Sequence, residues 1–545
     1  MASFEVNEDC KRMSILLFLL AIPGLLAFQV LDEHYWNKVS AEDLTESLNI
    51  ELNKRVAKNV ILFIGDGMGP NTATAARIYK KHEYGYLSWE RFNHVGALKT
   101  YSNDKQVPDS ACSATALFSG VKTNIHTLGV HSTVKKADCD SSILKENHVV
   151  TLATLAQDAG KATGIVTTTR VTHATPAAMY AHSSHRDWEC DTSLPYSASK
   201  CKDIARQLVE DEPGNNFNVV MGGGRQLLMT DPPSTPDDPI AEGIGTCKRV
   251  DGLNLIAEWT RRMEDKRVRF ALPKNRKELL DLDTSKTDYV LGIFCNDHFP
   301  YSYKVNYSDT SVPTLEEMTT KAIKVLNNNK NGFFLMVEGG LIDQGHHIGK
   351  ARIAVSETVH FSKTIKSTME LLEAAGILDE TLVIVTSDHS HTLTISGYPN
   401  IGSSIFGLAG ISKTDKLPFT TLSYAIAAKD NMKMRVVNGT LVREDPSKVD
   451  TTSYEYGTQG AAPNRVNVHG GSDVLVYATG PNAYLFHRMH EQTYVAEVIK
   501  YALRIGKYSP KPVPAEYHSS KSSKLMSSVI LLIMVQLIFS LKKLM

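Results

Sequence analysis

Uninterrupted runs of valine, isoleucine, leucine and phenylalanine recur along the chain, and they indicate the buried strands of a parallel sheet. A strand covered by helices on both faces reads as a continuous apolar run rather than as an alternation. Segments with helical spacing separate several runs, most clearly at 152–160, 351–376 and 492–505. This alternation predicts an α/β fold with a doubly wound, mostly parallel sheet and helices on both faces. The predicted strands are 60–64, 164–168, 217–221, 333–337, 382–386 and 474–478.

The pattern breaks at residues 392–465, which are rich in Gly, Ser, Thr and Asn and lack long helical periodicity. We interpret this segment as a small, surface-exposed subdomain inserted into the α/β core. The core then comprises residues 29–391 and, after the insertion, a last strand and helix within 466–508. At 545 residues the chain is long enough for a large core with such an insertion.

Both ends of the chain carry apolar segments of a different kind. Residues 1–28 join a basic flank to a short apolar run and predict a secretory signal peptide, with a retained signal anchor as the alternative. Residues 509–545 place small residues, a polar spacer and an apolar tail in the order of a glycosylphosphatidylinositol (GPI) attachment signal. The closing Lys542-Lys543 leaves a single-pass C-terminal anchor open. Either arrangement places the protein at the cell surface, on the outer face of the plasma membrane.

The formal net charge is zero, so no excess of charge points to nucleic acid or to an acidic partner. Export agrees with Asn306 and Asn438, which open acceptor sequences for N-glycosylation. We expect Cys10 to leave with the signal peptide and Cys112 to be a free core thiol. Spacing alone cannot pair the other cysteines, which are Cys139, Cys190, Cys201, Cys247 and Cys295.

Polar clusters that contain potential metal ligands follow several of the predicted strands. In doubly wound sheets, ligands bind outside the carboxyl ends of the strands. Together these clusters predict a hydrolase with several metal ions and a serine nucleophile. They are Gly65-Asp66-Gly67, Asp109-Ser110-Ala111, the segment from Glu338 through Asp343 to His347, Asp388-His389-Ser390-His391, and His469 with its two following glycines.

The ligand types divide into zinc-like and magnesium-like sets. Zinc takes imidazole nitrogen and carboxylate oxygen in tetrahedral sites, whereas magnesium prefers carboxylate, hydroxyl and water oxygen. Asp343 and His347 lie four residues apart, on one face if the segment is helical, and His469 could complete their set. The second zinc set is Asp66, Asp388 and His389, and the magnesium set is Asp66, Glu338 and a hydroxyl.

Simpler readings compete with these. An isolated Asp-His pair at a strand end is more often a structural hydrogen-bonded pair than a metal site. His346 competes with His347, and spacing only mildly favours His347. The glycines around Asp66 suggest a nucleotide-binding loop, but their spacing does not match the dinucleotide fingerprint, and an acidic centre repels phosphate unless a cation intervenes.

Ser110 precedes the helix-forming run 111–117. A serine at such a position is often only a helix cap. The same position lets backbone N–H groups stabilise an anionic intermediate, and a nearby zinc ion could deprotonate the hydroxyl. Asp109 is placed to hold a guanidinium group by paired hydrogen bonds, and Arg186 is the best candidate among the arginines.

Taken together, these motifs resemble the alkaline phosphatases, in the animal, membrane-anchored branch of that family, from about residue 35 to residue 508. The resemblance implies hydrolysis of a broad range of small phosphate monoesters to an alcohol and phosphate. It also implies two Zn²⁺ and one Mg²⁺ per chain, a homodimer and a lipid anchor. The motifs that carry it are 59–69, 107–111, 167–176, 337–347, 386–391 and 468–473.

The resemblance also implies a role for each matching residue. Ser110 would become a phosphoserine, Arg186 would clamp two phosphate oxygens, and Asp109 would orient Arg186. His391 would position a zinc-binding carboxylate, and His173 would lie near the magnesium ion. One zinc ion would be held by Asp343, His347 and His469, the other by Asp66, Asp388 and His389, and the magnesium ion by Asp66, Thr175 and Glu338.

Outside the site, the resemblance implies a Cys139–Cys201 disulfide. Residues 392–465 would correspond to the family's crown subdomain, through which Tyr398 would reach the partner's site in the dimer. A second family disulfide, near the C-terminus, has no counterpart in this chain.

The chain departs from the family pattern at three positions. Gln344 stands where vertebrate members carry a histidine beside the phosphate, and Leu341 replaces a basic residue of the same loop. Cys295 follows Phe294 where the family has an acid, so no calcium site is predicted. Two other functions remain open: a phosphodiesterase or sulfatase on the same core, and a surface receptor with weak activity.

Overall fold

The computed structural model describes residues 32–242, 246–431 and 434–510. The described residues 32–51 belong to a unit of their own. Within it, helix α2 (Glu33–Leu48) has no buried residue and is capped by Asp32, whose side chain accepts a hydrogen bond from the Tyr35 backbone N–H. The predicted signal peptide and anchor signal lie outside the described residues, except for 509–510. No helix within the described ranges is long and apolar enough to cross a membrane.

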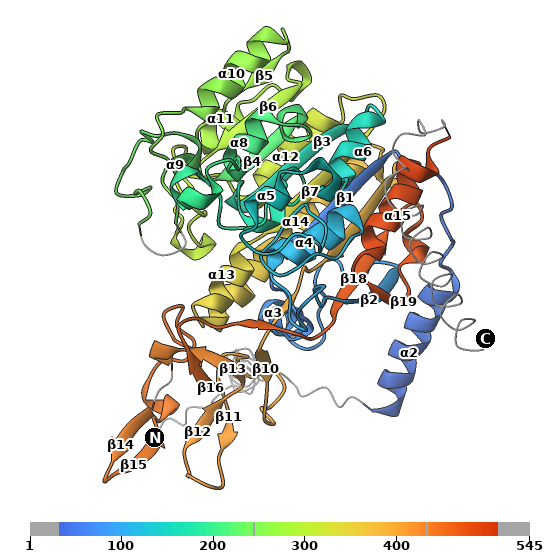
Figure 1. Cartoon of the computed structure of the whole chain (residues 1–545). Coiled ribbons are helices and arrows are strands. Elements are labelled where there is room, and N and C mark those ends of the chain that lie inside the picture. The colour runs from blue at the N-terminus through green and yellow to red at the C-terminus, as the bar shows by residue number, and fades with distance from the viewer. Residues whose placement is uncertain (1–31, 243–245, 432–433, 511–545) are drawn as a thin grey trace, which may run out of the picture. The chain divides into compact units, whose positions relative to one another are not determined.

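One ten-stranded sheet forms the centre of the unit that begins at Leu52 (Figure 1). The strand order is β19 (Arg488–Glu491), β2 (His94–Lys99), β18 (Val474–Thr479), β8 (Thr381–Thr386), β1 (Asn59–Gly65), β7 (Phe333–Gly339), β3 (Ala162–Arg170), β4 (Val219–Gly223), β6 (Tyr289–Ile293) and β5 (Phe270–Ala271). Strands β8 through β5 pair in parallel, as the continuous apolar runs predict. All six predicted strands are present, and the sequence analysis missed β2, β5, β6 and β19.

Strand β18 corrects one prediction. It pairs antiparallel with both β8 and β2, so the prediction that 474–478 is a parallel strand is wrong. Every second residue of β18 is exposed or half-buried. One face of this strand is therefore incompletely covered, as is common for antiparallel strands.

Helices cover both faces of the sheet, as predicted. Successive residues of β1 point to opposite sides, so Val60 and Leu62 belong to one apolar core and Ile61 and Phe63 to another. The first core includes α4 (Ser110–Ser119), α6 (Leu152–Asp158), α8 (Ile204–Glu210), α10 (Leu255–Asp265) and α15 (Tyr494–Leu503), and the second includes α3 (Pro70–Lys81), α12 (Leu315–Leu326) and α14 (Ala351–Ala374). The shorter helices are α5 (Cys139–Ser142), α7 (Ala174–Ala177), α9 (Arg225–Leu228), α11 (Arg276–Leu280) and α13 (Leu341–His347).

Residues 392–465, which we interpret from the sequence as an inserted segment, contain small sheets and, in their described part, no α-helix. The sheets are β10-β13-β16, β11-β12 and β14-β15, formed by β10 (Leu393–Ile395), β11 (Leu408–Ile411), β12 (Pro418–Thr420), β13 (Leu422–Ala428), β14 (Met434–Val437), β15 (Thr440–Arg443) and β16 (Gly460–Asn464). The chain enters through β9 (Ser390–His391) and leaves through β17 (His469–Gly470). These two short strands pair antiparallel and set His469 opposite His391.

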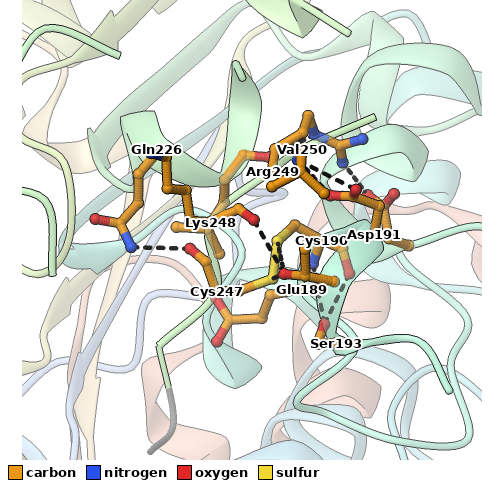
Figure 2. Close-up of a disulfide and its surroundings, with 12 residues drawn as sticks. Glu189, Cys190, Asp191, Ser193, Gln226, Cys247, Lys248, Arg249 and Val250 are labelled. Carbon is orange, nitrogen blue, oxygen red and sulfur yellow. Dashed lines mark hydrogen bonds and ion pairs between the residues drawn. A yellow bond between two sulfur atoms is a disulfide. The ribbon is translucent and has the colours of Figure 1, made fainter. Parts of the chain in front are cut away.

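Two disulfides link segments between residues 139 and 247. The Cys139–Cys201 bond agrees with the family resemblance. The second bond joins Cys190 to Cys247 (Figure 2), a pairing that spacing could not supply. Cys112 is a buried free thiol, as predicted, and Cys295 is another.

Removing the second disulfide should destabilise the protein without touching the strand ends. The Cys190→Ala/Cys247→Ala double variant frees a loop of 57 residues, and a bond of this kind stabilises a fold by about 2–4 kcal/mol. We expect a lower melting temperature and a lower urea midpoint than in the wild type. Cys112→Ala, which removes a buried thiol but no crosslink, is the control. Equal melting temperatures for the double variant and the wild type would contradict the expected role of this disulfide.

Candidate metal centre and active site

Three carboxylates meet at one edge of the sheet because β8, β1 and β7 are neighbours. Asp66 follows β1 directly, Glu338 is the penultimate residue of β7, and Asp388 follows β8 after one intervening residue. In the parallel register, Ile64 lies beside both Glu338 and Thr386. The three carboxylates therefore leave neighbouring strands at nearly the same level, and all of them are fully buried.

Potential ligand atoms form three groups, each with its atoms within 4.8 Å of one another. The first group is Asp343, His347, His391 and His469, which contains one predicted zinc set and adds His391. The second group is Asp66, Asp388 and His389, which is the other predicted zinc set. The third group is Asp66, His173 and Glu338, which joins His173 to two predicted magnesium ligands.

The chemistry of these groups fits metal cations. Several of their buried atoms have no hydrogen-bond partner among the described residues, and an unpaired buried polar atom is costly. Burial, together with the charge of neighbouring carboxylates, raises the pKa of Asp66 well above its usual value. Burial likewise raises the pKa of Asp388 to about 6 and that of Glu338 to about 7. A cation would relieve this destabilisation. The atoms without a partner include both Asp66 carboxylate oxygens, Thr175 Oγ1, Glu338 Oε1, His173 Nδ1, Asp388 Oδ2 and His389 Nδ1.

The structure separates His347 from its competitor His346. His346 lies 3.0 Å from Thr72 Oγ1 and 2.7 Å from Tyr424 Oη, so both of its ring nitrogens have structural partners. His347 and His469 instead bring their Nε2 atoms to within 3.1 Å of each other. Their Nδ1 atoms contact the backbone carbonyls of Asn467 and Pro108. This is how metal-binding histidines are commonly oriented, with one nitrogen held and the other left for the ion.

His391 contacts a carboxylate of the first group, as the resemblance implies. Its Nε2 lies 2.5 Å from Asp343 Oδ1, and its Nδ1 faces the Val468 carbonyl at 3.2 Å. The His391 ring also packs against Gly67, in the loop after β1. At Gly67 φ is +68°, and an added Cβ would lie 2.7 Å from the His391 ring, so a side chain has no room there. Packing against the histidine therefore explains this glycine without a nucleotide.

Ser110 is the first residue of α4, and Asp109 is its N-cap. Ser110 Oγ lies 3.2 Å from His389 Nε2 and is buried beside the second ligand group. Residues after Asp109 form a helix because its side chain accepts the Cys112 backbone N–H, and Gly120 ends the helix in a left-handed conformation. The serine is thus held on a rigid element, with its hydroxyl directed to the group of Asp66, Asp388 and His389.

Asp109 and Arg186 form the predicted ion pair, but through one hydrogen bond rather than the predicted two, because Asp109 Oδ1 accepts the backbone N–H groups of His126 and Cys112. Arg186 Nη1 donates to Asp109 Oδ2 at 2.9 Å, while Nη2 lies 3.0 Å from His173 Nε2. Burial opposes ionisation of Asp109, but hydrogen bonds from His126 and the charge of Arg186 outweigh it and hold its pKa well below the usual value. The guanidinium is therefore fixed between a carboxylate and a histidine, close to both Ser110 and the third ligand group.

Sequence reasoning missed several supporting residues. The His126 backbone N–H donates to Asp109 Oδ1 at 3.0 Å, and no local motif marks His126. The hydroxyls of Thr167 and Thr169 both donate to Glu338 Oε2. Their alternation along β3 was a usable signal, since residues two apart on a strand face the same side.

Other predicted residues lie outside this cluster. Tyr398 is 99% exposed on the inserted segment, so it does not contribute to the site of its own chain. Asn306 and Asn438 are exposed. Gln344 Nε2 donates to Asp343 Oδ2 at 3.3 Å, whereas Leu341 is buried and points into a separate cavity.

Comparisons with known proteins agree with this geometry. Residues 57–505 match the family model for alkaline phosphatase. The human tissue-nonspecific alkaline phosphatase is 42% identical over 487 residues, which cover 87% of this chain and 89% of the human protein. Alkaline phosphatase 4 of Drosophila melanogaster is 40% identical over 501 residues, covering 87% and 82% of the two chains.

Solved structures show the same fold. The alkaline phosphatase of the Antarctic bacterium TAB5 has a TM-score of 0.56 at 22% identity and covers 84% of this chain and 100% of its own. The Thermus thermophilus enzyme also gives a TM-score of 0.56 at 22% identity, covering 84% and 93%. The match across the α/β core and the close curated relatives lead to one conclusion. The chain belongs to the alkaline phosphatase family and is a hydrolase of phosphate monoesters.

Proposed function

We propose that hydrolysis proceeds through a phosphoserine on Ser110. The observation that carries this proposal is the position of Ser110 Oγ, which lies 3.2 Å from His389 Nε2 at the start of α4. The oxygen would attack phosphorus as the alcohol leaves on the opposite side, and water would then displace the serine oxygen from the phosphoserine. The two displacements release an alcohol and inorganic phosphate and restore the serine.

We assign two Zn²⁺ and one Mg²⁺ to each chain. When bound, these ions lower the pKa of the serine hydroxyl and of water, and they balance the charge of the phosphoryl group. The chain contributes their ligands on rigid strand ends and helices, and His391 orients Asp343. The zinc ligands are Asp343, His347 and His469 for one ion and Asp66, Asp388 and His389 for the other; the magnesium ligands are Asp66, Thr175 and Glu338, with His173 beside them.

Arg186 would bind two phosphate oxygens, because its planar guanidinium is already oriented by Asp109 and His173. Replacing Arg186 by lysine keeps the charge but removes the paired donors. We expect kcat/KM for an aryl phosphate to fall about 10–100-fold, and the inhibition constant for inorganic phosphate to rise with it. Arg206→Lys, at a partly exposed arginine paired with Glu210 on α8, is the control. Unchanged phosphate inhibition in Arg186→Lys would contradict the clamp.

Relative rates on monoesters and diesters test the proposed function against its alternatives. A phosphate monoester offers three free oxygens for the cations and Arg186, whereas a diester or sulfate ester carries less charge. We expect the metal-loaded enzyme to hydrolyse an aryl phosphate at least about a hundredfold faster than the matching aryl methyl phosphate or aryl sulfate. A preference for the diester or the sulfate would overturn the assignment. Absence of phosphate release with metals supplied would favour the receptor.

We propose that the substrate range is broad and that the protein acts at the cell surface as a GPI-anchored homodimer. The exposure of Tyr398 supports a role in contacting a partner chain. Asn306 and Asn438 would carry glycans.

Phosphatidylinositol-specific phospholipase C should release activity from intact cells. Activity that stays on the membrane would support the single-pass anchor instead, and a monomeric mass in solution would contradict the dimer.

A further inference from the structure

A cavity of about 160 Å³ lies between the middle of α14, the segment 299–316 and the start of α13. None of the proposed metal ligands lines it. For comparison, an engineered cavity of about 150 Å³ in another protein accommodates benzene. The space is therefore large enough for a small organic molecule with one six-membered ring.

The walls of this cavity are mostly apolar, and they surround one carboxylate. Phe299, Leu315 and Phe361 contribute buried apolar side chains. Glu357 is 7% exposed. Its Oε1 accepts the Ser302 backbone N–H at 2.7 Å, and its Oε2 accepts the Ser302 hydroxyl at 2.9 Å. The carboxyl group is thus held in a defined orientation at the cavity wall.

Glu357 has no ion pair with a lysine, arginine or histidine of the described residues. Two basic residues line the cavity: Lys363 is exposed and pairs with Glu316 at 2.9 Å, and burial lowers the pKa of His360. Burial raises the pKa of Glu357 to about 7, although the two hydrogen bonds from Ser302 oppose the rise. A buried carboxylate without a counter-charge is costly to ionise, and a cation placed beside it removes much of that cost.

Leu341 adds to the apolar wall. It lines the same cavity and is 3% exposed, so it contributes carbon surface and no charge. The cavity therefore offers a carboxylate without an ion pair, apolar walls and free volume.

We propose that this cavity binds a small organic cation, an alkylammonium or amidinium ion whose apolar body is about the size of one six-membered ring. The charged group would pair with Glu357, and the ring would pack against Leu315, Leu341 and Phe361. An anion would be repelled, and a neutral ligand would leave the carboxylate unpaired. A bare divalent metal ion prefers several oxygen ligands, whereas this cavity has mainly carbon walls. The site is distinct from the phosphate site, although Leu341 opens the helix that carries Asp343.

Calorimetric titration of benzylammonium chloride into the metal-loaded wild-type protein tests the proposal. Saturating inorganic phosphate keeps the active site filled throughout. We expect one saturable site per chain, and binding of the neutral isostere benzyl alcohol about 10–100-fold weaker, because it lacks the charge. Glu357→Gln should weaken benzylammonium binding by a similar factor. Leu341→Arg should abolish it by supplying an internal cation and filling the space.

Glu370→Gln is the matched control, since Glu370 lies exposed on the same helix and pairs with Lys366. It should bind benzylammonium as the wild type does. Equal affinities for wild type, Glu357→Gln and Leu341→Arg would overturn the proposal, as would the absence of saturable binding in the wild type. If Glu357→Gln does not fold, Leu341→Arg and the comparison with benzyl alcohol still decide. Equal binding of benzyl alcohol and benzylammonium to the wild type would also refute a cation site.

Discussion

Replacing Ser110 by alanine should lower kcat for an aryl phosphate by about 10⁴-fold or more. The variant removes the only atom that the proposed mechanism makes covalent with phosphorus. Its neighbours should stay in place, because the helix cap comes from Asp109 and the ligand groups do not depend on the serine. Zinc and magnesium contents should therefore match the wild type. Inorganic phosphate should still bind, with Arg186 retained. The measurement is release of the aryl alcohol by the purified, metal-loaded protein at alkaline pH.

Ser119→Ala is the matched control for this experiment. Ser119 is buried at the opposite end of the same helix from Ser110. Its hydroxyl donates to the Thr115 carbonyl. We expect it to keep nearly full activity. Acid quenching during turnover of a labelled substrate should trap label on wild-type protein and none on Ser110→Ala. Activity of Ser110→Ala within about tenfold of the wild type would refute a covalent serine mechanism.

Removing the metal ions should cost about a thousandfold or more in activity. Cations contribute several kcal/mol of transition-state stabilisation in enzymes of this chemistry, and each 1.36 kcal/mol corresponds to about tenfold in rate. Dialysis against a chelator, followed by return of zinc and magnesium separately and together, measures the effect. Full recovery should require both metals. Elemental analysis of the restored protein should give about two zinc ions and one magnesium ion per chain.

The same experiment has a readout that does not depend on activity. The buried carboxylates of Asp66, Glu338 and Asp388 have raised pKa values when no cation accompanies them. The metal-free protein should therefore melt at a lower temperature than the restored protein, since ions that bind only the native state stabilise it. Glu357→Gln, which changes a buried carboxylate outside the ligand groups, should show the same stabilisation by metals. Full activity with no detectable metal would contradict the proposed chemistry.

Much of the site could be predicted because its carboxylates occupy the same position relative to the predicted strands. Asp66, Glu338 and Asp388 each come at the end of a continuous apolar run. Parallel strands bring such ends to one edge, so the pattern of runs was enough to place these carboxylates together. The Asp343 and His347 pair followed from helical spacing in the same way, and α13 confirms the helix. The end of an apolar run and a spacing of four residues are both local features, so the sequence displays them directly.

Other contacts depend on how distant segments meet. His469 reaches Asp343 and His347 because β17 pairs with β9 across the inserted segment, and no spacing rule reports that pairing. The choice of His347 over His346 rests on Thr72 and Tyr424, because these two residues contact both ring nitrogens of His346.

The sequence by itself determined the α/β class, the strand-end carboxylates, the serine at a helix start and the family. Only the tertiary structure decided the direction of β18, the Cys190–Cys247 bond and the cavity around Glu357. The physical reason is the range of the interactions involved. Hydrophobic periodicity and helix capping act between residues a few positions apart, so they leave a pattern in the sequence. Strand pairing, disulfide geometry and cavity volume depend on residues that are remote in the chain and become neighbours only when the core packs.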